Sequence, residues 1–288
     1  MSAIVIDGKA LAAKLSEETR DRASRLKERG IAPCLAVVLV GENPASLSYV
    51  RGKQKALAEA GMEGRDIRLP EAASETKLLS LVASLNADAE VHGILVQLPL
   101  PPHIREEVII NAIDPRKDVD CFHPVSLGKL LQGQPGFLPC TPQGIVVLLK
   151  ELKVPIAGSH TVIVGRSNIV GKPLALLLAR RELNATVTIC HTGTADLASH
   201  TCRADILIAA AGKPSLIKGA MIKKGAAVID VGVNRVPDVS KKKGYRLAGD
   251  VDFNEALETA GWITPVPGGV GPMTIAMLMR NVAEAAGG

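Results

Sequence analysis

The chain has 288 residues, enough for one large or two ordinary domains, and hydrophobic residues make up 47% of it, which excludes wholesale disorder. Aromatic residues make up only 2%, which argues against a nucleic-acid surface built on base stacking and favours the Ala, Val, Leu and Ile cores of parallel α/β sheets. The formal net charge of +5 is modest, is compatible with anionic substrates and identifies no partner class.

The cysteines and the N-terminus bear on the compartment. The five cysteines are odd in number and include no C-x-x-C pair, which favours reduced thiols in a cytosolic protein. The N-terminal segment MSAIVIDGKALAAKL has no basic stretch followed by an apolar run, so no secretory signal is predicted. No apolar stretch reaches about 18 residues without a charge. We therefore expect a cytoplasmic protein that makes no membrane contact.

Apolar runs and helical spacing alternate through the first half of the chain. The run LAVVLV predicts a fully buried strand, and Asn43 followed by Pro44 predicts the start of the next helix. The predicted elements are, in order, a helix over 8–29, a strand over 35–40, a helix from 44 to Gly61, a short strand over 66–69, a helix over about 75–86, a strand over 93–98 and a helix over 104–111. Strands alternating with helices indicate right-handed βαβ units and a parallel sheet.

From Thr141 the pattern restarts at an even spacing that is typical of a doubly wound nucleotide domain. The predicted elements are a helix over 142–152, a strand over 161–164, a helix over 172–181, strand-like segments at 186–190, 205–209 and 226–231, a Pro/Gly-rich loop and a final helix. That helix has an apolar face that needs a partner, which predicts its return to the first domain. We predict an α/β fold in two domains: an N-terminal βαβ catalytic domain over 1–140 plus 272–288, and a Rossmann-type domain over 141–271.

Tyr49 and Lys53 lie four residues apart in the helix that follows the strand over 35–40, so both side chains project from one face near the carboxyl end of that strand. An amine beside an aromatic ring at the mouth of an α/β sheet is suited to hold a flat heterocycle and move a proton. The alternative is a solvated lysine and a tyrosine partly packed on the sheet, because most helix lysines are surface charges.

Gln97 closes the predicted strand over 93–98, where a strand-end amide is well placed to contact a ligand, or else to cap the backbone of the loop. Asp118 and Asp120 would share one face of an extended segment, and one of them can accept a bidentate hydrogen bond from ligand N–H groups. The alternative for this pair is a turn with solvated acids.

A zinc site is not predicted. Cys121 and His123 form a single C-x-H pair, and no second pair of ligands accompanies it at the spacing that zinc sites use.

The turn GRSNIVG follows the predicted strand TVIV, but Ser167 and Val170 stand at the second and third glycine positions of G-x-G-x-x-G. The strand before it and the helix after it still allow the helix N-terminus to receive a phosphate. The next strand ends in Cys190-His191-Thr192, without the carboxylate that binds the ribose hydroxyls of NAD, whereas Arg166 lies in the turn. This favours NADP over NAD. The alternative is a βα turn that binds no nucleotide.

Nine stretches occur in order over nearly the whole chain: VGENPAS..YVRGKQK, GILVQLPLP, KDVD.FH, PCTPQG, VGRSNIVGKP, ATVTICHT, DVGVNR, GDVDF and TPVPGGVGPMT. This ordered set resembles the bifunctional methylenetetrahydrofolate dehydrogenase/methenyltetrahydrofolate cyclohydrolase (FolD) family. The resemblance implies oxidation of 5,10-methylenetetrahydrofolate by NADP, hydrolysis of the methenyl product to 10-formyltetrahydrofolate, and a place in one-carbon metabolism and purine biosynthesis. It also implies a homodimer formed through the nucleotide domain.

The resemblance implies roles for individual residues. Lys53 matches the catalytic lysine, Tyr49 the ring-stacking tyrosine, Gln97 the glutamine that tunes the lysine, and Asp120 the aspartate that grips the pterin. The loop beside the folate corresponds to Pro267, Gly268, Gly269, Val270 and Gly271. The cofactor contacts correspond to Gly165, Arg166, Ser167, Thr192 and Val233. No metal is implied, because the methenyl carbon is already electrophilic.

Two departures from the family pattern concern the folate pocket. Cys121 stands where the family usually has glycine, and Ser126 stands where it usually has asparagine. A side chain at position 121 would narrow the pocket if the backbone must approach the pterin closely. The other hypotheses are a two-domain dehydrogenase of the shikimate type, which explains neither Tyr49 nor Asp120, and a non-catalytic NADP-binding module.

Overall fold

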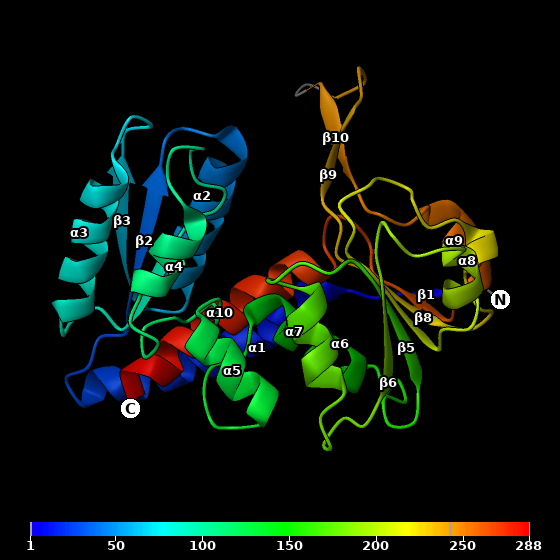
Figure 1. Ribbon diagram of the computed structural model, residues 1–288. Coiled ribbons are helices and arrows are strands. Elements are labelled where there is room, and N and C mark those ends of the chain that lie inside the picture. Colours follow the sequence, from blue (N-terminus) through cyan, green and yellow to red (C-terminus); the bar gives the residue numbers. More distant parts are fainter. Residues whose placement is uncertain (1, 242–243, 288) are drawn as a thin grey trace. The chain divides into compact units, whose positions relative to one another are not determined.

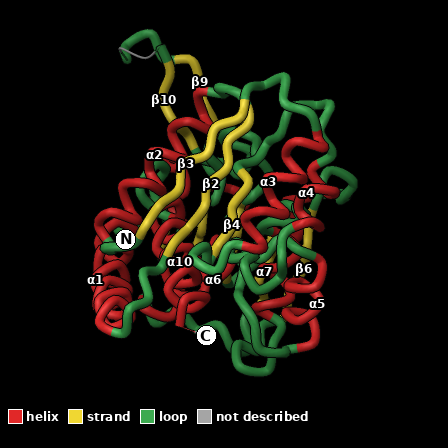
Figure 2. Tube along the Cα trace, turned by 90° about the vertical axis from the view of Figure 1, so that its left-hand side faces the viewer, coloured by secondary structure: helices red, strands yellow, loops and turns green. Residues whose placement is uncertain are grey.

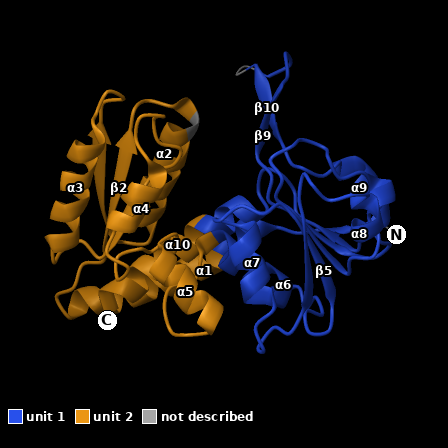
Figure 3. Cartoon of the chain, viewed as in Figure 1, with its two compact units in different colours: residues 1–12, 141–274 blue, residues 13–140, 275–288 orange. Residues whose placement is uncertain are grey.

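Parallel strands lie at the centre of both halves of the chain, as the alternation of apolar runs and helices predicts (Figure 1). The structure is a computed structural model that describes residues 2–241 and 244–287. It divides into unit 1, residues 1–12 and 141–274, and unit 2, residues 13–140 and 275–288 (Figure 3). The predicted α/β fold with parallel sheets is confirmed.

Unit 2 contains a three-stranded parallel sheet in the order β3-β2-β4, whose strands lie side by side in Figure 2. Its elements are most of α1 (Gly8–Glu28), then β2 (Cys34–Val40), α2 (Pro44–Glu59), β3 (Glu63–Leu69), α3 (Glu75–Ala87), β4 (Gly93–Val96), α4 (Glu106–Ala112) and α5 (Pro124–Gln132). All seven residues of β2 are buried, because β2 is the central strand and helices cover the sheet. The edge strand β3 is more exposed.

Unit 1 contains a six-stranded parallel sheet in the order β1-β11-β8-β7-β5-β6 and a separate antiparallel hairpin, β9 with β10. Its elements are β1 (Ile4–Val5), α6 (Cys140–Glu151), β5 (His160–Val164), α7 (Gly171–Leu178), β6 (Thr186–Cys190), α8 (Leu197–Thr201), β7 (Ile206–Ala209), η1 (Gly219–Met221), β8 (Ala227–Asp230), β9 (Asn234–Pro237), β10 (Tyr245–Ala248), α9 (Phe253–Thr259) and β11 (Trp262–Ile263). The helix α10 (Val270–Gly287) begins in unit 1 and continues in unit 2.

The structure differs from the prediction at the N-terminus. The predicted first domain includes residues 1–12, whereas these residues belong to unit 1 because β1 pairs with β11 at the edge of the six-stranded sheet. Each of these strands has two residues, too few for an alternating pattern, so only the pairing partner reveals them.

The helix α5 was also not predicted. His123 caps it by accepting a hydrogen bond from the backbone N–H of Val125 through Nδ1 (3.0 Å), and Pro124 occupies its first position. Histidine is not a usual cap residue, which is why the start of α5 carries a weak sequence signal.

The C-terminal end of α10 belongs to unit 2, as the apolar face of the final helix predicts. Leu278, Met279 and Val282 are 2%, 1% and 0% exposed. The apolar face of the final helix is therefore buried in unit 2.

Candidate active site

Lys53 and Gln97 form the centre of the candidate site in unit 2. Lys53 projects from α2, and its Nζ donates a hydrogen bond of 2.9 Å to Oε1 of Gln97, the residue that follows β4. Nε2 of Gln97 donates to the carbonyl of Leu98 (2.8 Å), which orients the amide with its oxygen towards the amine. The backbone N–H of Gln97 donates to the carbonyl of Val38, so the end of β4 is fixed on β2. The structure therefore brings together two predicted residues that are 44 positions apart.

The electrostatic partner of Lys53 is Asp120. Burial lowers the pKa of the Lys53 amine from its ordinary value, and the charge of Asp120 opposes that shift. Burial likewise raises the pKa of Asp120, with the charge of Lys53 opposing. A lowered pKa increases the fraction of the amine that is uncharged at a given pH, and the uncharged amine is the form that accepts a proton.

Asp118 has a different role from Asp120. Its carboxylate accepts hydrogen bonds from the backbone N–H groups of Phe122 (3.1 Å) and His123 (2.9 Å) and from Oγ of Ser126 (2.6 Å). The segment is a turn, and Asp118 is 3% exposed. Asp118 organises the turn that presents Asp120, and the two carboxylates do not share the face of an extended strand.

Cys121 adopts a left-handed backbone conformation, with φ of 61°, at the position where the family usually has glycine. Its thiol is buried and donates to the carbonyl of Phe137 (3.2 Å). Burial raises the pKa of this thiol far above its ordinary value, so it remains protonated. The side chain therefore packs inside unit 2, and the turn keeps the backbone shape that glycine favours.

Tyr49 lies one helical turn before Lys53 in α2 and is 51% exposed. A half-exposed ring leaves a face free to stack on a flat heterocycle. Its role against the pterin stays a prediction.

The turn between β5 and α7 in unit 1 carries three of the predicted cofactor contacts. Gly165 has φ of 135°, and a Cβ there would overlap the carbonyl oxygen of Ala210. A Cβ at Gly171 would overlap the carbonyl oxygen of Gly165. Oγ of Ser167 accepts a hydrogen bond from the backbone N–H of Val170 (3.1 Å), which closes the turn. Gly165 thus lets the turn lie against the backbone of Ala210, and Gly171 lets the start of α7 lie against the turn, although the spacing is not that of G-x-G-x-x-G. A tight turn between a strand and a helix N-terminus fits the pyrophosphate of a dinucleotide.

Arg166, Thr192 and Val233 are all exposed and follow the carboxyl ends of β5, β6 and β8. The register pairs Val164 with Cys190, and the ends of β7 and β8 pair alongside, so these loops lie at one edge of the sheet. That edge is where dinucleotides bind in doubly wound sheets. The individual contacts stay predictions.

Two buried carboxylates, absent from the sequence-based predictions, hold the loops at this edge. Oδ2 of Asp250 accepts from the backbone N–H groups of Ala211 (2.6 Å) and Gly212 (2.8 Å), and its Oδ1 accepts from Nδ2 of Asn234 (2.8 Å). Asp230 accepts from three backbone N–H groups, those of Gly232, Asp250 and Val251. Burial raises the pKa of Asp230 to about 6, with these hydrogen bonds opposing. Asp230 begins the motif DVGVNR and Asp250 lies in the motif GDVDF, so these motifs were the sequence signal for the two carboxylates.

The loop from Pro267 to Gly269 belongs to unit 1. Gly268 has φ of 113°, and a Cβ at Gly8 would overlap the carbonyl oxygen of Gly269, so the loop packs directly on the start of α1. Its predicted contact with the folate stays a prediction.

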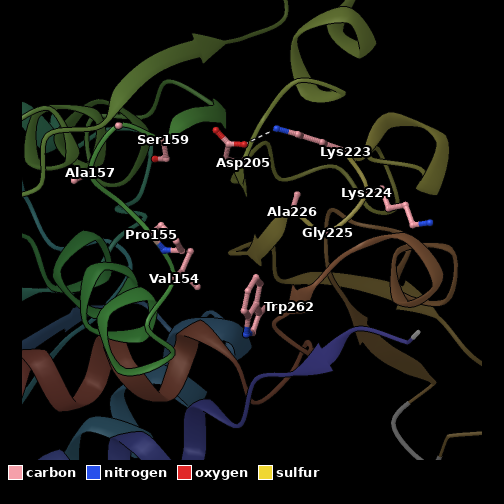
Figure 4. A pocket seen from close by; sticks show the side chains of 11 residues that line it. Val154, Pro155, Ala157, Ser159, Asp205, Lys223, Lys224, Gly225, Ala226 and Trp262 are labelled. Carbon is pink, nitrogen blue, oxygen red and sulfur yellow. Dashed lines mark hydrogen bonds and ion pairs between the residues drawn. The ribbon is translucent and has the colours of Figure 1, made fainter.

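A pocket of about 500 Å³ in unit 1 lies at the amino ends of the strands, away from the edge just described (Figure 4). Its lining includes Trp262 and the ion pair of Lys223 with Asp205 (2.6 Å). Because dinucleotides bind at the carboxyl ends, this pocket is not the nucleotide site.

Within residues 2–241 and 244–287, no cluster of three or more His, Cys, Asp or Glu side chains has the arrangement of a metal site. In the same described part of the chain, no helix combines the length and the apolar character needed to cross a membrane.

Two family models match the chain, and together they cover most of it. The first describes the tetrahydrofolate dehydrogenase/cyclohydrolase catalytic domain and matches residues 6–120. The second describes the NAD(P)-binding domain of tetrahydrofolate dehydrogenase/cyclohydrolase and matches residues 139–287.

Relatives match over the full length. The bifunctional protein FolD of Exiguobacterium sibiricum is 58% identical, with 99% of each chain covered. The structure of the bifunctional FolD enzyme of Campylobacter jejuni superposes with a TM-score of 0.94 at 48% identity, covering 99% of both chains. The methylenetetrahydrofolate dehydrogenase-cyclohydrolase of Trypanosoma brucei, solved with NADP and an inhibitor, gives a TM-score of 0.95 at 42% identity, covering 100% of this chain and 98% of the other.

Proposed function

This chain belongs to the tetrahydrofolate dehydrogenase/cyclohydrolase family, and from that premise we infer that it catalyses both reactions of the family name. It oxidises 5,10-methylenetetrahydrofolate to the 5,10-methenyl cation with NADP, and it hydrolyses that cation to 10-formyltetrahydrofolate. Bound NADP supplies the acceptor for the hydride, and the residues of the chain bind, orient and move protons.

Lys53 is the residue that we propose for proton transfer in the second reaction. Water adds to the methenyl carbon and loses one proton, and the carbon–nitrogen bond then opens as the ring nitrogen gains one. The hydrogen bond of 2.9 Å from Nζ of Lys53 to Oε1 of Gln97 supports this role, because it holds the amine in one orientation while burial lowers the pKa of the amine. A cationic substrate beside Lys53 would lower the pKa of the amine further.

We propose that the carboxylate of Asp120 accepts hydrogen bonds from N–H groups of the pterin and that the ring of Tyr49 stacks on the pterin. Gln97 is proposed to hold the Lys53 amine, and the loop from Pro267 to Gly269 to contact the folate. These roles rest on the resemblance and on the grouping of Lys53, Gln97 and Asp120 in unit 2.

NADP is proposed to bind at the carboxyl edge of the six-stranded sheet. Gly165 and Ser167 shape the turn that would receive the pyrophosphate, and the exposed guanidinium of Arg166 would pair with the 2′-phosphate. Thr192 and Val233 would flank the cofactor. Unit 1 would then be the NADP domain and unit 2 the folate domain.

The remaining proposals concern the setting of the enzyme. We propose that it acts in the cytoplasm as a homodimer formed through the nucleotide domain and that its product supplies purine biosynthesis. The low content of aromatic residues supports a protein without a nucleic-acid partner. Sedimentation at several protein concentrations tests the dimer, and a monomer at every concentration would contradict it.

One coupled assay tests the activity and the role of Lys53 together. NADPH formation and methenyl absorbance are followed in the same cuvette with methylenetetrahydrofolate as substrate. We expect both signals from the natural chain, and loss of methenyl hydrolysis in Lys53→Met. The matched control is Lys55→Met, which removes an exposed lysine that pairs with Glu59 on the same helix. A Lys53→Met protein that hydrolyses methenyltetrahydrofolate at the natural rate would refute the role.

A further inference from the structure

The last helix carries a single buried amide in unit 2. Asn281 in α10 is 1% exposed, and its helix neighbours Leu278 and Val282 are also buried. An amide at such a place costs about 1–3 kcal/mol if it lacks hydrogen-bond partners. Its partners therefore explain why an asparagine is tolerated there.

Nδ2 of Asn281 uses both of its hydrogens on distant backbone groups. It donates to the carbonyl of Val119 (2.8 Å) and to the carbonyl of Leu138 (3.0 Å), and it lies 3.6 Å from Sγ of Cys140. One side chain thus joins α10 to two loop segments that are 162 and 143 residues away.

Val119 is adjacent in sequence to Asp120, which acts on Lys53, and Leu138 lies two residues before Cys140, which also acts on Lys53. Val119 directly precedes Asp120, and the thiol of Cys140 donates to the same Val119 carbonyl (3.4 Å). On its other side Val119 packs under β4, where a Cβ at Gly93 would come within 2.9 Å of its methyl groups. Val119 is therefore held on both sides, and the carboxylate of Asp120 follows its position.

The charges that act on this cluster are few. The charge of Asp120 is the largest that acts on Lys53, and Asp120 is in turn affected by the charges of Lys53 and Asp118 and by a hydrogen bond with the protonated thiol of Cys140. Asp118 is already committed to its own turn by three hydrogen bonds. A shift of the Asp120 loop would therefore change the surroundings of Lys53 mainly through one carboxylate.

We propose that Asn281 is a positioning residue that fixes the Asp120 carboxylate relative to the Lys53 amine. The inference deepens the function proposed above and rests on the role given there to Lys53. Asn281 does not touch the reacting atoms. It acts by holding the backbone on which Asp120 stands.

The test is Asn281→Ala, with two readouts. The pKa of Lys53 is followed by NMR of ¹⁵N-labelled lysine side chains, which needs no turnover, and the pH profile of methenyl hydrolysis is measured on the same protein. When Asp120 moves away, the attraction that raises the pKa of Lys53 weakens. We expect that pKa to fall by about 0.5 unit or more, which moves the acid limb of the pH profile to lower pH by the same amount. The kcat on the high-pH plateau, where the amine is already neutral, should fall roughly tenfold because Asp120 no longer holds the pterin in place beside the amine. The KM for NADP should stay unchanged.

The matched control is Asn86→Ala. Asn86 is also a side-chain clamp in unit 2: its Nδ2 donates to the carbonyl of Ala112 (2.7 Å), and its Oδ1 accepts from the backbone N–H of Asp114 (2.9 Å). Its loss should reduce the stability of unit 2 and leave the titration of Lys53 unchanged. If Asn281→Ala fails to fold, Asn281→Ser keeps one donor, and a smaller shift in the same direction is expected.

The pathway through Asp120 is tested by repeating the substitution in an Asp120→Asn background. There Asn281→Ala should no longer move the pKa of Lys53. The proposal is overturned if Lys53 titrates identically in Asn281→Ala and Asn86→Ala, or if the shift persists without the Asp120 carboxylate. If the natural chain shows neither activity but Asn281→Ala still lowers the pKa of Lys53, the proposed function is refuted and the positioning role of Asn281 stands.

Discussion

The amine of Lys53 accepts a proton only when it is uncharged, so the groups that set its pKa also set the pH range of methenyl hydrolysis. Burial lowers that pKa below the ordinary lysine value. The neutral amine predominates above the pKa that Lys53 has in the folded protein. The rate of methenyl hydrolysis should therefore rise with pH through that pKa and be lost below it. This acid limb of the pH profile is the signature of Lys53 if it acts as proposed.

Gln97→Glu should move the acid limb to higher pH. The substitution puts a carboxylate where a neutral amide oxygen now lies 2.9 Å from Nζ, and an adjacent negative charge favours the ammonium form. We expect a shift of about one unit or more in initial rates of methenyl hydrolysis. Gln132→Glu, the same change at an exposed position in α5, should leave the limb in place. An identical limb in both variants would contradict the coupling.

Cys121 combines an unfavourable backbone conformation with a well-packed side chain. Its left-handed φ of 61° is costly for a side chain, while its buried thiol donates to the Phe137 carbonyl. Cys121→Gly and Cys121→Ala both lose the thiol, but only glycine relieves the backbone. Urea unfolding should therefore show the glycine variant to be more stable than the alanine variant by roughly 0.5–1 kcal/mol. The reverse order would show that this conformation carries no penalty here.

At the scale of elements, the carboxylate of Asp250 joins the segments that follow β7 and β8. Asp250 accepts from Ala211 and Gly212 in the loop after β7 and from Asn234, the first residue of β9, which follows the loop after β8. Loops at the carboxyl edge of a parallel sheet form the nucleotide site, so their shape determines cofactor affinity.

Asp250→Asn should weaken NADP binding. The new amide presents N–H groups to backbone donors that need an acceptor, and an unpaired buried donor costs about 1–3 kcal/mol, which corresponds to a rise of roughly 5- to 150-fold in the Kd for NADP. Asp252→Asn is the matched control: Asp252 caps α9 and pairs with Lys218, and asparagine is also a good cap. Calorimetric titration with NADP checks both variants, and equal affinities would contradict the loop argument.

At the scale of the whole molecule, neither unit is a continuous segment. Residues 1–12 complete the sheet of unit 1, and residues 275–288 complete the core of unit 2. Unit 1 therefore needs the N-terminal residues to complete its sheet, and unit 2 needs the C-terminal residues to complete its core. The C-terminal part of α10 is linked to the candidate active site through the hydrogen bond of Asn281 with the carbonyl of Val119, the residue before Asp120.

Val282→Asp tests whether the two units lose structure separately. Val282 is fully buried, and an unpaired carboxylate there should destabilise unit 2 by about 3 kcal/mol or more. We expect folate affinity to be lost while NADP affinity stays within a few-fold, and urea unfolding to show two transitions. Arg280→Asp places the same residue at an exposed neighbouring position and should change neither. Simultaneous loss of both affinities would show one cooperative unit.

The candidate site was partly readable from the sequence. Lys53 follows β2 and Gln97 follows β4, and neighbouring parallel strands end at one edge, so their proximity follows from the pattern of elements alone. Asn281 was not readable, because nothing local links it to Val119, 162 residues away. One polar residue on the apolar face of the last helix was the only signal.

The sequence alone determined the α/β architecture, the long strands and helices, and the family, because apolar periodicity and ordered motifs are local properties of the chain. Only the tertiary structure decided the two-residue strands β1 and β11, the membership of residues 1–12 in unit 1, and the separate duties of Asp118 and Asp120. The strands and the unit membership depend on partners far away in the sequence, and the duty of Asp118 depends on backbone donors four and five residues later that only the folded turn brings to its carboxylate. A backbone donor or carboxylate finds that partner only after the chain has packed, when an unpaired buried polar group becomes too costly to keep.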